Sequence, residues 1–407
     1  MNDEDLAKFF CQRVWRFARA DGSIVVPELR LLPGGRFLNS RHANESTWRI
    51  RDGRIDFLNV AGDVTTTFTD ARSDPDARAE FTGKFLGNPD SDTIHTLNEV
   101  KPQSIGRPST ALRTAVLVRT HIVSQKLWNL LESLYGSPLY DLYVLADTTH
   151  RRLSFPGVDV ISHTVSMCKD LGLHTDFDTV LWKCGDFPIY CAASQIAKYD
   201  YYIQIEFDVH LIRQNSLFIE GIINRLKVPS SGSLDLVIPF LGMASPSWIW
   251  TAAAARRYPE VYRSFFPFIV MSARAVDHLL EERRREAALG PIGPDVVHCE
   301  AFCGTALIAT GNYVCKSLED IMPGSISWRT FHPQTEVNFL LGSYITPDPR
   351  IEMAHPVLEA DAYLARALRQ AKIHGKLDEF LVSLDQLDQN LVSSTLRDEF
   401  RRRALLP

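Results

Sequence analysis

Two acidic residues and a histidine end a run of aromatic and β-branched residues at positions 199–210, YDYYIQIEFDVH. The composition of this run predicts a buried strand. Residues two apart on an extended chain share a face, so Glu206 and Asp208 point the same way at the end of the strand. Two neighbouring carboxylates repel each other unless a cation or a proton offsets their charge. Oxygen ligands at this spacing suit Mg²⁺ or Mn²⁺, which in turn suit a diphosphate. In the alternative interpretation, both acids are solvated where a strand leaves the core and bind nothing.

An α/β domain is expected to position these acids. From residue 114 onward, short apolar runs alternate with helical patterns, and this texture predicts a mixed, mostly parallel sheet with helices on both faces. Strands are expected at 114–121 and 140–150, with a helix between them. A second helix begins near GDFPIY (185–190), where Asp186 is the expected N-cap. Side chains at the carboxyl ends of such strands line the crevice in which ligands bind.

The sequence on either side of this domain predicts other kinds of secondary structure. Leu6, Phe10 and Val14 recur at helical spacing, and later residues alternate around Asp52-Gly53, a strong hairpin signal. Gly375 is expected to divide two helices near the C-terminus. The chain is thus expected to contain an N-terminal helix (1–21), a small antiparallel β module (22–98), a linker (99–113), the α/β domain (114–356) and C-terminal helices (357–407).

Composition excludes several classes of protein. The 407 residues are 45% hydrophobic and 23% charged, which is typical of a globular protein, and a net charge of -5 gives no support for nonspecific nucleic-acid binding. The start, MNDEDLAK, lacks the features of a signal peptide, and no apolar run approaches a membrane span, so a cytoplasmic protein is expected. Seven cysteines do not form a disulfide framework, and HCEAFC (298–303) lacks the spacing of a zinc site.

The segments GDFPIY and YDYYIQIEFDV together resemble a group of GT-A-fold nucleotide-diphospho-sugar glycosyltransferases that carry GD-x-P-x-Y and IE-[YF]-DV motifs. The resemblance covers about residues 112–357 and is specific mainly between 182 and 210. It implies a metal-dependent transferase that moves a sugar from a nucleotide diphosphate to a hydroxyl of a glycan or glycolipid, as in polysaccharide biosynthesis. It also implies an inverting reaction with a carboxylate base.

The resemblance assigns residues to the nucleotide side. The loop after the first strand carries this role in the family, and here it contains Arg119, Thr120 and His121. Asp147, which closes the second strand, matches an acid that contacts the base or the ribose. Asp186 is expected first as a helix cap and second as a nucleotide-side residue.

The same resemblance assigns the metal and the base. Asp208 takes the metal-binding role, whereas Glu206 departs from the usual DxD pattern and contacts either the ribose or a metal-bound water. A late histidine often completes the metal shell in the family; His355 is favoured over His332, although each precedes a proline and could be a turn residue. Glu300 is the expected base, and a charge at a helix start is the competing explanation.

The acceptor is expected near Trp248 and Trp250, within an aromatic-rich stretch at 244–268. Arg256 and Arg257 in this stretch leave a peripheral membrane contact open. Two other functions also stay open: an inactive, GT-A-like carbohydrate-binding or scaffold protein, and a metal-dependent phosphoesterase. The sequence does not identify the nucleotide sugar, the acceptor, the role of the β module or the oligomeric state.

Overall fold

The computed structural model describes the chain except residues 1, 12, 33–34, 39–43, 73–78, 89–90, 101–111, 156–157, 213–214, 229–231, 290–295, 332–338, 341–349, 351, 388–391 and 406–407. The chain forms two compact units. The first comprises Met1–Ala111, Tyr135–Pro138 and Ser154–Val160, and the second comprises Leu112–Leu134, Leu139–Leu153 and Ile161–Pro407. Most of the linker expected at 99–113 lies outside the described residues.

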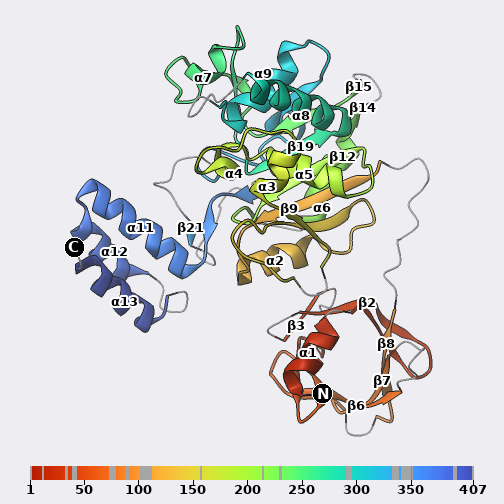
Figure 1. Ribbon diagram of the computed structural model, residues 1–407. Helices are drawn as coiled ribbons and strands as arrows, with labels where there is room; N and C mark the ends of the chain where they lie inside the picture. Colours follow the sequence, from red (N-terminus) through yellow and green to blue (C-terminus); the bar gives the residue numbers. More distant parts are fainter. Residues whose placement is uncertain are drawn as a thin grey trace. The chain divides into compact units, whose positions relative to one another are not determined.

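The first unit is a closed antiparallel β-barrel in which each strand pairs with the next and β1 closes the ring by pairing with β8 (Figure 1). Asp52 and Gly53 both have positive φ, as the expected hairpin between β4 and β5 requires. The elements of this unit are α1 (Asp3–Cys11), β1 (Trp15–Arg19), β2 (Ile24–Leu32), β3 (Arg36–Leu38), β4 (Thr47–Arg51), β5 (Arg54–Leu58), β6 (Val64–Arg72), β7 (Glu80–Phe85) and β8 (Ile94–Glu99).

The N-terminal helix is shorter than the sequence pattern predicts. It ends at Cys11, and Trp15–Arg19 is a strand, so the prediction of a helix over 1–21 and of a β module starting at residue 22 is wrong. Trp15 and Phe17 are buried on alternate positions of β1, the period of a strand. Because β1 pairs with both β2 and β8, Trp15–Arg19 is a strand and not a continuation of the helix.

The second unit contains a mixed seven-stranded sheet in the order β11-β10-β9-β12-β19-β16-β20. β9 pairs in parallel with β10 and β12, whereas β19 is antiparallel to both of its neighbours. The strands are β9 (Thr114–Thr120), β10 (Asp141–Asp147), β11 (Val160–His163), β12 (Tyr201–Glu206), β16 (Leu236–Ile238), β19 (Phe268–Ser272) and β20 (Cys315–Ser317).

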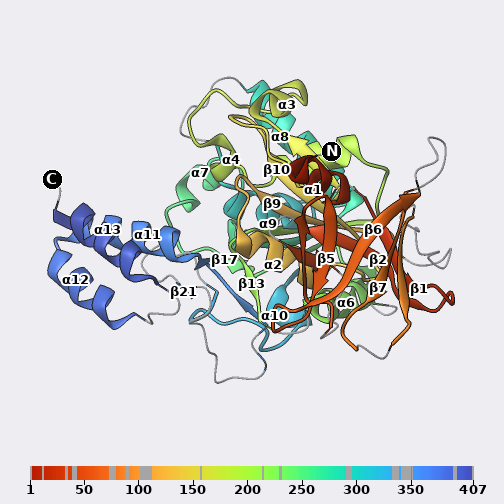
Figure 2. The same ribbon diagram turned by 90° about the horizontal axis from the view of Figure 1, so that it is seen from below.

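Helices cover both faces of this sheet, as expected (Figures 1 and 2). Ala115 and Leu117 of β9 pack in one core cluster with side chains of α5, α8 and α9, whereas Val116 and Val118 are buried toward the other face. The helices are α2 (Gln125–Leu134), α3 (Val165–Asp170), α4 (Val180–Lys183), α5 (Phe187–Gln195), α6 (Asn215–Leu226), α7 (Thr251–Ala255), α8 (Ala273–Ala288), α9 (Cys299–Ala309) and α10 (Leu318–Ile321).

Short two-stranded sheets also lie in this unit, some between distant segments and one, β14–β15, a local hairpin. They are β13 (His210–Leu211) with β22 (Met353–Ala354), β14 (Lys227–Val228) with β15 (Gly232–Ser233), β17 (Gly242–Met243) with β18 (Tyr262–Arg263), and β21 (Phe339–Leu340) with β23 (Val357–Leu358).

The C-terminal residues form three helices with a small core of their own. These are α11 (Ala360–His374), α12 (Leu377–Gln386) and α13 (Ser394–Leu405). Gly375 ends α11 with a left-handed backbone, which confirms its predicted place between two helices. Among the described residues, no helix is long and apolar enough to cross a membrane.

Candidate functional site

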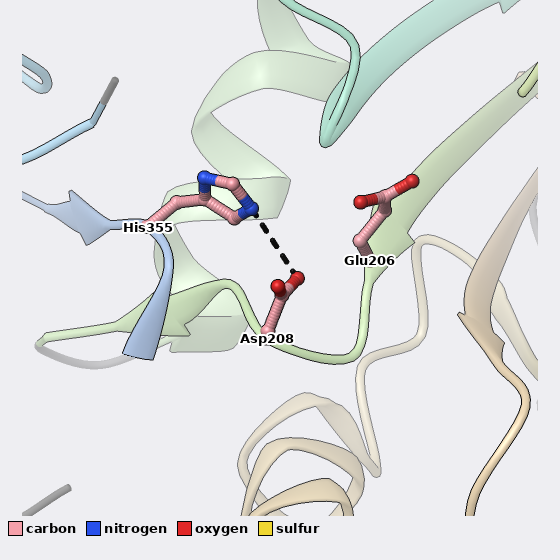
Figure 3. Close-up of side chains that lie close together, drawn as sticks. All are labelled: Glu206, Asp208 and His355. Atoms are coloured by element: carbon pink, nitrogen blue, oxygen red, sulfur yellow. Dashed lines mark ion pairs between the residues drawn. The ribbon is translucent and has the colours of Figure 1, made fainter. Parts of the chain in front are cut away.

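Glu206, Asp208 and His355 lie together where β12 ends (Figure 3). One potential ligand atom from each residue lies within 4.8 Å of those of the other two. The imidazole Nε2 of His355 is 3.3 Å from Oδ1 of Asp208. Glu206 is the last residue of the strand, and Asp208 lies in the turn that follows, so the acid pair sits at the carboxyl end of a central strand, as the sequence predicts.

Backbone pairing brings His355 to the acid pair. β13 begins two residues after Asp208 and pairs antiparallel with β22, which ends immediately before His355. The amide of Val357 also donates to the carbonyl of Asp208 at 2.8 Å. The favoured histidine therefore reaches Asp208 through a pairing that its position in the sequence does not reveal. His332, the alternative, lies outside the described residues.

The charge balance of this cluster suits a divalent cation. Burial pushes the pKa of Asp208 upward, but His355 and Lys126 outweigh it and hold the pKa at about 2. Burial raises the pKa of Glu206, the charge of Asp208 adds to this rise, and Arg119 opposes it. Nδ1 of His355 is buried without a hydrogen-bond partner among the described residues, whereas Oδ1 of Asp208 faces Nε2 of His355. Two carboxylates and an imidazole whose potential ligand atoms all lie within 4.8 Å of one another fit Mn²⁺ or Mg²⁺.

Lys126 of α2 supports the turn that carries Asp208. Its ammonium donates to the carbonyls of Phe207 and Val209, at 2.5 and 2.8 Å. Its backbone amide donates to Oε1 of Glu359 at 2.6 Å. Burial lowers the pKa of Lys126 to about 8, and the charges of Asp208 and Glu359 oppose this shift. The sequence analysis did not single out this lysine, because its role depends on contacts with carbonyl groups far away in the chain.

Arg119 links the acid pair to α4. Its Nη1 donates to Oε1 of Glu206 at 2.9 Å, and its Nη2 donates to the carbonyl of Leu181. Gly185 allows this approach: a Cβ there would lie 3.1 Å from Nη1 of Arg119 and 3.0 Å from the ring of Phe266. The glycine of the GDFPIY segment is therefore needed for close packing beside the guanidinium.

A short segment before β19 connects the acid pair to Glu300. The carbonyl of Pro267 accepts from the amide of Glu206 at 2.8 Å. The amide of Phe266 donates to Oε1 of Glu300 at 3.4 Å, and the ring of Phe265 lies 5.2 Å from that of His355. Three successive residues thus contact the three parts of the candidate site, which the sequence analysis did not foresee.

Glu300 lies in the first turn of α9, and its side chain is only 12% exposed. Burial raises the pKa of Glu300 to about 8, and the negative charge of Glu206 adds to this rise. The amide of Phe266 and the side chain of Trp250 hydrogen-bond to the carboxylate and oppose it. The carboxyl can therefore exchange a proton near neutral pH, as a general base must.

His298 and Trp250 hold Glu300 in place. His298 is the N-cap of α9, and its Nδ1 accepts from the amide of Glu300 at 3.3 Å. The Trp250 ring stacks on the His298 ring, with centroids 4.2 Å apart and planes 8° from parallel. Burial lowers the pKa of His298 to about 3, so its ring is neutral and its 3.8 Å approach to Glu300 is not an ion pair.

The expected nucleotide-side residues lie around the ends of β9 and β10. His121 packs edge-on against Phe207, with ring centroids 5.0 Å apart, and Oδ1 of Asp147 accepts from the amide of Thr149. Burial lowers the pKa of His121, and the charges of Asp147 and Asp208 partly restore it. The hydroxyl of Thr120 is engaged locally, because it donates to the carbonyl of Ile122 at 2.7 Å.

His163 was missed by the sequence analysis. It ends β11, has no exposed surface, and has no hydrogen-bond partner for either ring nitrogen among the described residues. Burial lowers its pKa to about 3; the charge of Arg119 adds to the effect and that of Asp147 opposes it. A histidine at the carboxyl end of the strand beyond Asp147 was the signal available in the sequence.

Asp186 is held within the core. It occupies the N-cap position of α5, but its side chain makes no capping hydrogen bond. Its two carboxylate oxygens instead accept from Arg283, at 2.8 and 2.9 Å, and Oδ2 also accepts from Tyr190. Neither Asp186 nor the side chain of Arg283 has exposed surface. Asp186 thus occupies the predicted N-cap position, but its carboxylate bonds the buried arginine, the stronger partner, and does not cap the helix.

The predicted acceptor residues differ in their surroundings. Trp248 and Trp250 are both half-buried and pack against the main core cluster, and Trp250 also bonds Glu300. Arg257 pairs with Glu286, whose side chain is 3% exposed, so it is engaged internally. α7 spans only five residues, which gives no support for an interfacial membrane helix here.

No protein-family model matches the chain, and no curated protein is similar to it in sequence. Solved structures of glycosyltransferases resemble it remotely. Mouse xyloside xylosyltransferase 1 is 12% identical with a TM-score of 0.31, and the alignment covers 57% of this chain and 89% of that one. The galactosyltransferase LgtC is 10% identical with a TM-score of 0.31 over 58% and 81% of the two chains. A glycosyltransferase involved in glycosylation of the major capsid of PBCV-1 is 12% identical, with a TM-score of 0.27 over 57% and 86%.

Proposed function

We propose that this protein is a metal-dependent glycosyltransferase that moves a sugar from a nucleotide diphosphate to a hydroxyl of a glycan or glycolipid. The observation that carries the proposal is the joining of two groups by residues 265–267. One is the cluster of Glu206, Asp208 and His355, and the other is the buried Glu300, whose pKa is raised to about 8. A cation site beside a carboxyl that can take up a proton is the combination that sugar transfer requires.

Asp208 and His355 would hold Mn²⁺ or Mg²⁺, which when bound neutralises charge on the leaving diphosphate. Glu206 is shared between this cluster and Arg119, because its Oε1 already accepts from the guanidinium. Arg119 can therefore orient Glu206 and also present positive charge toward the donor phosphates. We assign His121, Asp147 and, next to them, Thr120 to the nucleotide side. Asp186 would act only by supporting α5 from within the core.

Glu300 would act as the base in an inverting reaction. It takes the proton of the acceptor hydroxyl as the acceptor oxygen forms its bond to the anomeric carbon and the bond from that carbon to the diphosphate oxygen breaks. His298 and Trp250 would keep the carboxylate oriented, and the amide of Phe266 stabilises its charged form. Trp248 and Trp250 would lie on the acceptor side.

The test is donor turnover in the absence of an acceptor, in which water replaces the hydroxyl. The protein is incubated with UDP- and GDP-linked sugars plus Mn²⁺ or Mg²⁺, and release of the free nucleotide is followed by chromatography. We expect slow release from at least one donor, which stops in EDTA and in Asp208→Asn. Release from none of the donors with either metal would contradict the proposal. Hydrolysis of simple phosphate esters in the same preparation would favour a phosphoesterase instead.

A further inference from the structure

Trp182 is an exposed aromatic side chain on α4, in the same unit as the candidate site. Trp182 is 64% exposed, whereas Val180 and Leu181 before it are buried. The carbonyl of Leu181 accepts from Arg119, which pairs with Glu206. The backbone of α4 is thus attached to the donor side of the site, one residue away from the exposed indole.

The Trp182 ring contacts two further rings, and we call Trp182, Trp250 and His298 together the three-ring corner. Its ring centroid lies 6.0 Å from that of Trp250, with planes 68° apart, and 5.2 Å from that of His298, with planes 74° apart. Trp250 and His298 are themselves stacked face to face. The Trp182 indole therefore stands roughly perpendicular to a stacked pair and has a large exposed surface.

This corner is connected directly to Glu300. Trp250 hydrogen-bonds to the carboxylate of Glu300, and His298 accepts from its backbone amide. The residues assigned to the nucleotide lie at the ends of β9 and β10, grouped about Arg119. The ligand that must reach Glu300 is the acceptor, so the acceptor is the molecule that these rings would meet.

We propose that Trp182, together with Trp250, is a platform for the acceptor sugar, on which the apolar C–H face of a pyranose ring stacks next to the reacting hydroxyl. The proposal rests on the proposed function for the role of Glu300 as base. A rigid aromatic side chain binds such a face with little loss of conformational freedom, which explains why an indole is held exposed here. The occupant is a carbohydrate with a flat C–H face, and recognition of its hydroxyl groups falls to neighbouring polar side chains.

Trp182→Ala and Trp182→Phe test the platform, and Trp328→Ala is the matched control. Trp328 is 49% exposed and stacks on Phe240, with ring centroids 3.8 Å apart. It is not among the rings that contact Trp182, Trp250 and His298 in the part of the chain that the structure describes. The probes are lactose, maltose and cellobiose, titrated at millimolar concentrations with UDP and Mn²⁺ present and followed by saturation-transfer NMR and calorimetry. UDP and GDP titrations with Mn²⁺ are run on every variant.

We expect at least one disaccharide to bind, with affinity reduced up to about tenfold by Trp182→Ala, less by Trp182→Phe, and less than twofold by Trp328→Ala. Nucleotide affinity should be equal in all four proteins. Binding of none of the three sugars, or equal losses in Trp182→Ala and Trp328→Ala, would overturn the platform. Self-association of the wild type that Trp182→Ala abolishes would also overturn it, since the surface would then belong to a second copy of the chain.

The two proposals fail separately in this experiment. If nucleotides bind with Mn²⁺ but no sugar does, the platform is wrong and the proposed function stands. If a sugar binds through Trp182 and neither nucleotide binds, the transferase proposal is wrong. The three-ring corner is then a carbohydrate-binding site in a protein that binds no nucleotide donor.

Discussion

Replacing Glu300 by glutamine should make the protein more stable at neutral pH while removing the proposed base. The side chain is 12% exposed, and burial raises its pKa from an ordinary 4.5 to about 8. Because the pKa is raised in the folded state, the folded protein keeps the Glu300 proton between about pH 4.5 and 8, where the unfolded chain has released it. The contribution of this group to stability is therefore fully present below pH 4.5 and is lost as the pH rises to about 8.

The size of the effect follows from this range. At about 1.36 kcal/mol per pKa unit, the wild type loses roughly 3 kcal/mol of unfolding free energy between acidic pH and pH 7, and at most about 5 kcal/mol above pH 8. Glutamine has no proton to lose, and its amide oxygen can still accept from Phe266. The difference in unfolding free energy between Glu300→Gln and wild type should therefore grow by between about 3 and 5 kcal/mol from pH 4 to pH 8.

The assay is urea unfolding at a series of pH values, followed by fluorescence and circular dichroism. Glu379→Gln is the matched control, because its side chain is 72% exposed and pairs with Lys376 three residues before it. The control curve should parallel the wild type within about 0.5 kcal/mol. A difference between Glu300→Gln and wild type that stays flat from pH 4 to pH 8 would refute the burial argument, and with it the case for Glu300 as base.

Three further results are expected. The rate of donor turnover should rise with pH up to about 8, because Glu300 works as a base only when unprotonated; a rate that falls over this range would exclude it. Asp186→Asn should lower the unfolding free energy by up to about 3–5 kcal/mol, since it leaves the buried Arg283 with Glu286 as its remaining carboxylate partner; a loss below about 1 kcal/mol in urea unfolding would contradict the buried pair. Lys126→Met should cost about 1–3 kcal/mol of stability and weaken metal-dependent nucleotide binding, because the carbonyls on both sides of Asp208 lose their donor. Lys169→Met, at a lysine whose side chain is 69% exposed, should change neither quantity.

Local sequence patterns predicted the parts of the site that depend on one segment. The strand pattern correctly places β12, which ends at Glu206, and the apolar runs at 114–121 and 140–150 correspond to β9 and β10. The aromatic-rich stretch likewise drew attention to Trp250. These features follow from backbone geometry and burial within a few residues. Asp208 lies in the turn beyond β12, so the shared face expected for two residues of one extended strand is not what brings the two acids together.

Features that depend on distant pairing were not predictable in the same way. His355 reaches Asp208 only because β13 pairs with β22, and nothing in either short segment specifies that partner. Lys126 donates to the carbonyl of Phe207, which follows another strand, and the pKa of His163 is lowered in part by the charge of Arg119 on another strand. The end of α1 was misplaced because the helical spacing of Leu6, Phe10 and Val14 runs past Cys11, whereas pairing within the barrel makes Trp15–Arg19 a strand.

Calorimetric titration of UDP and GDP tests the central claim most directly. The titrations are run with Mn²⁺ and with EDTA, on the wild type, on Asp208→Asn and on Asp277→Asn, a control at an exposed position of α8. We predict that one nucleotide binds only with Mn²⁺, that Asp208→Asn abolishes this binding and that Asp277→Asn leaves it unchanged. Binding that is the same in EDTA, or that survives in Asp208→Asn, would contradict a metal-dependent donor site at the end of β12.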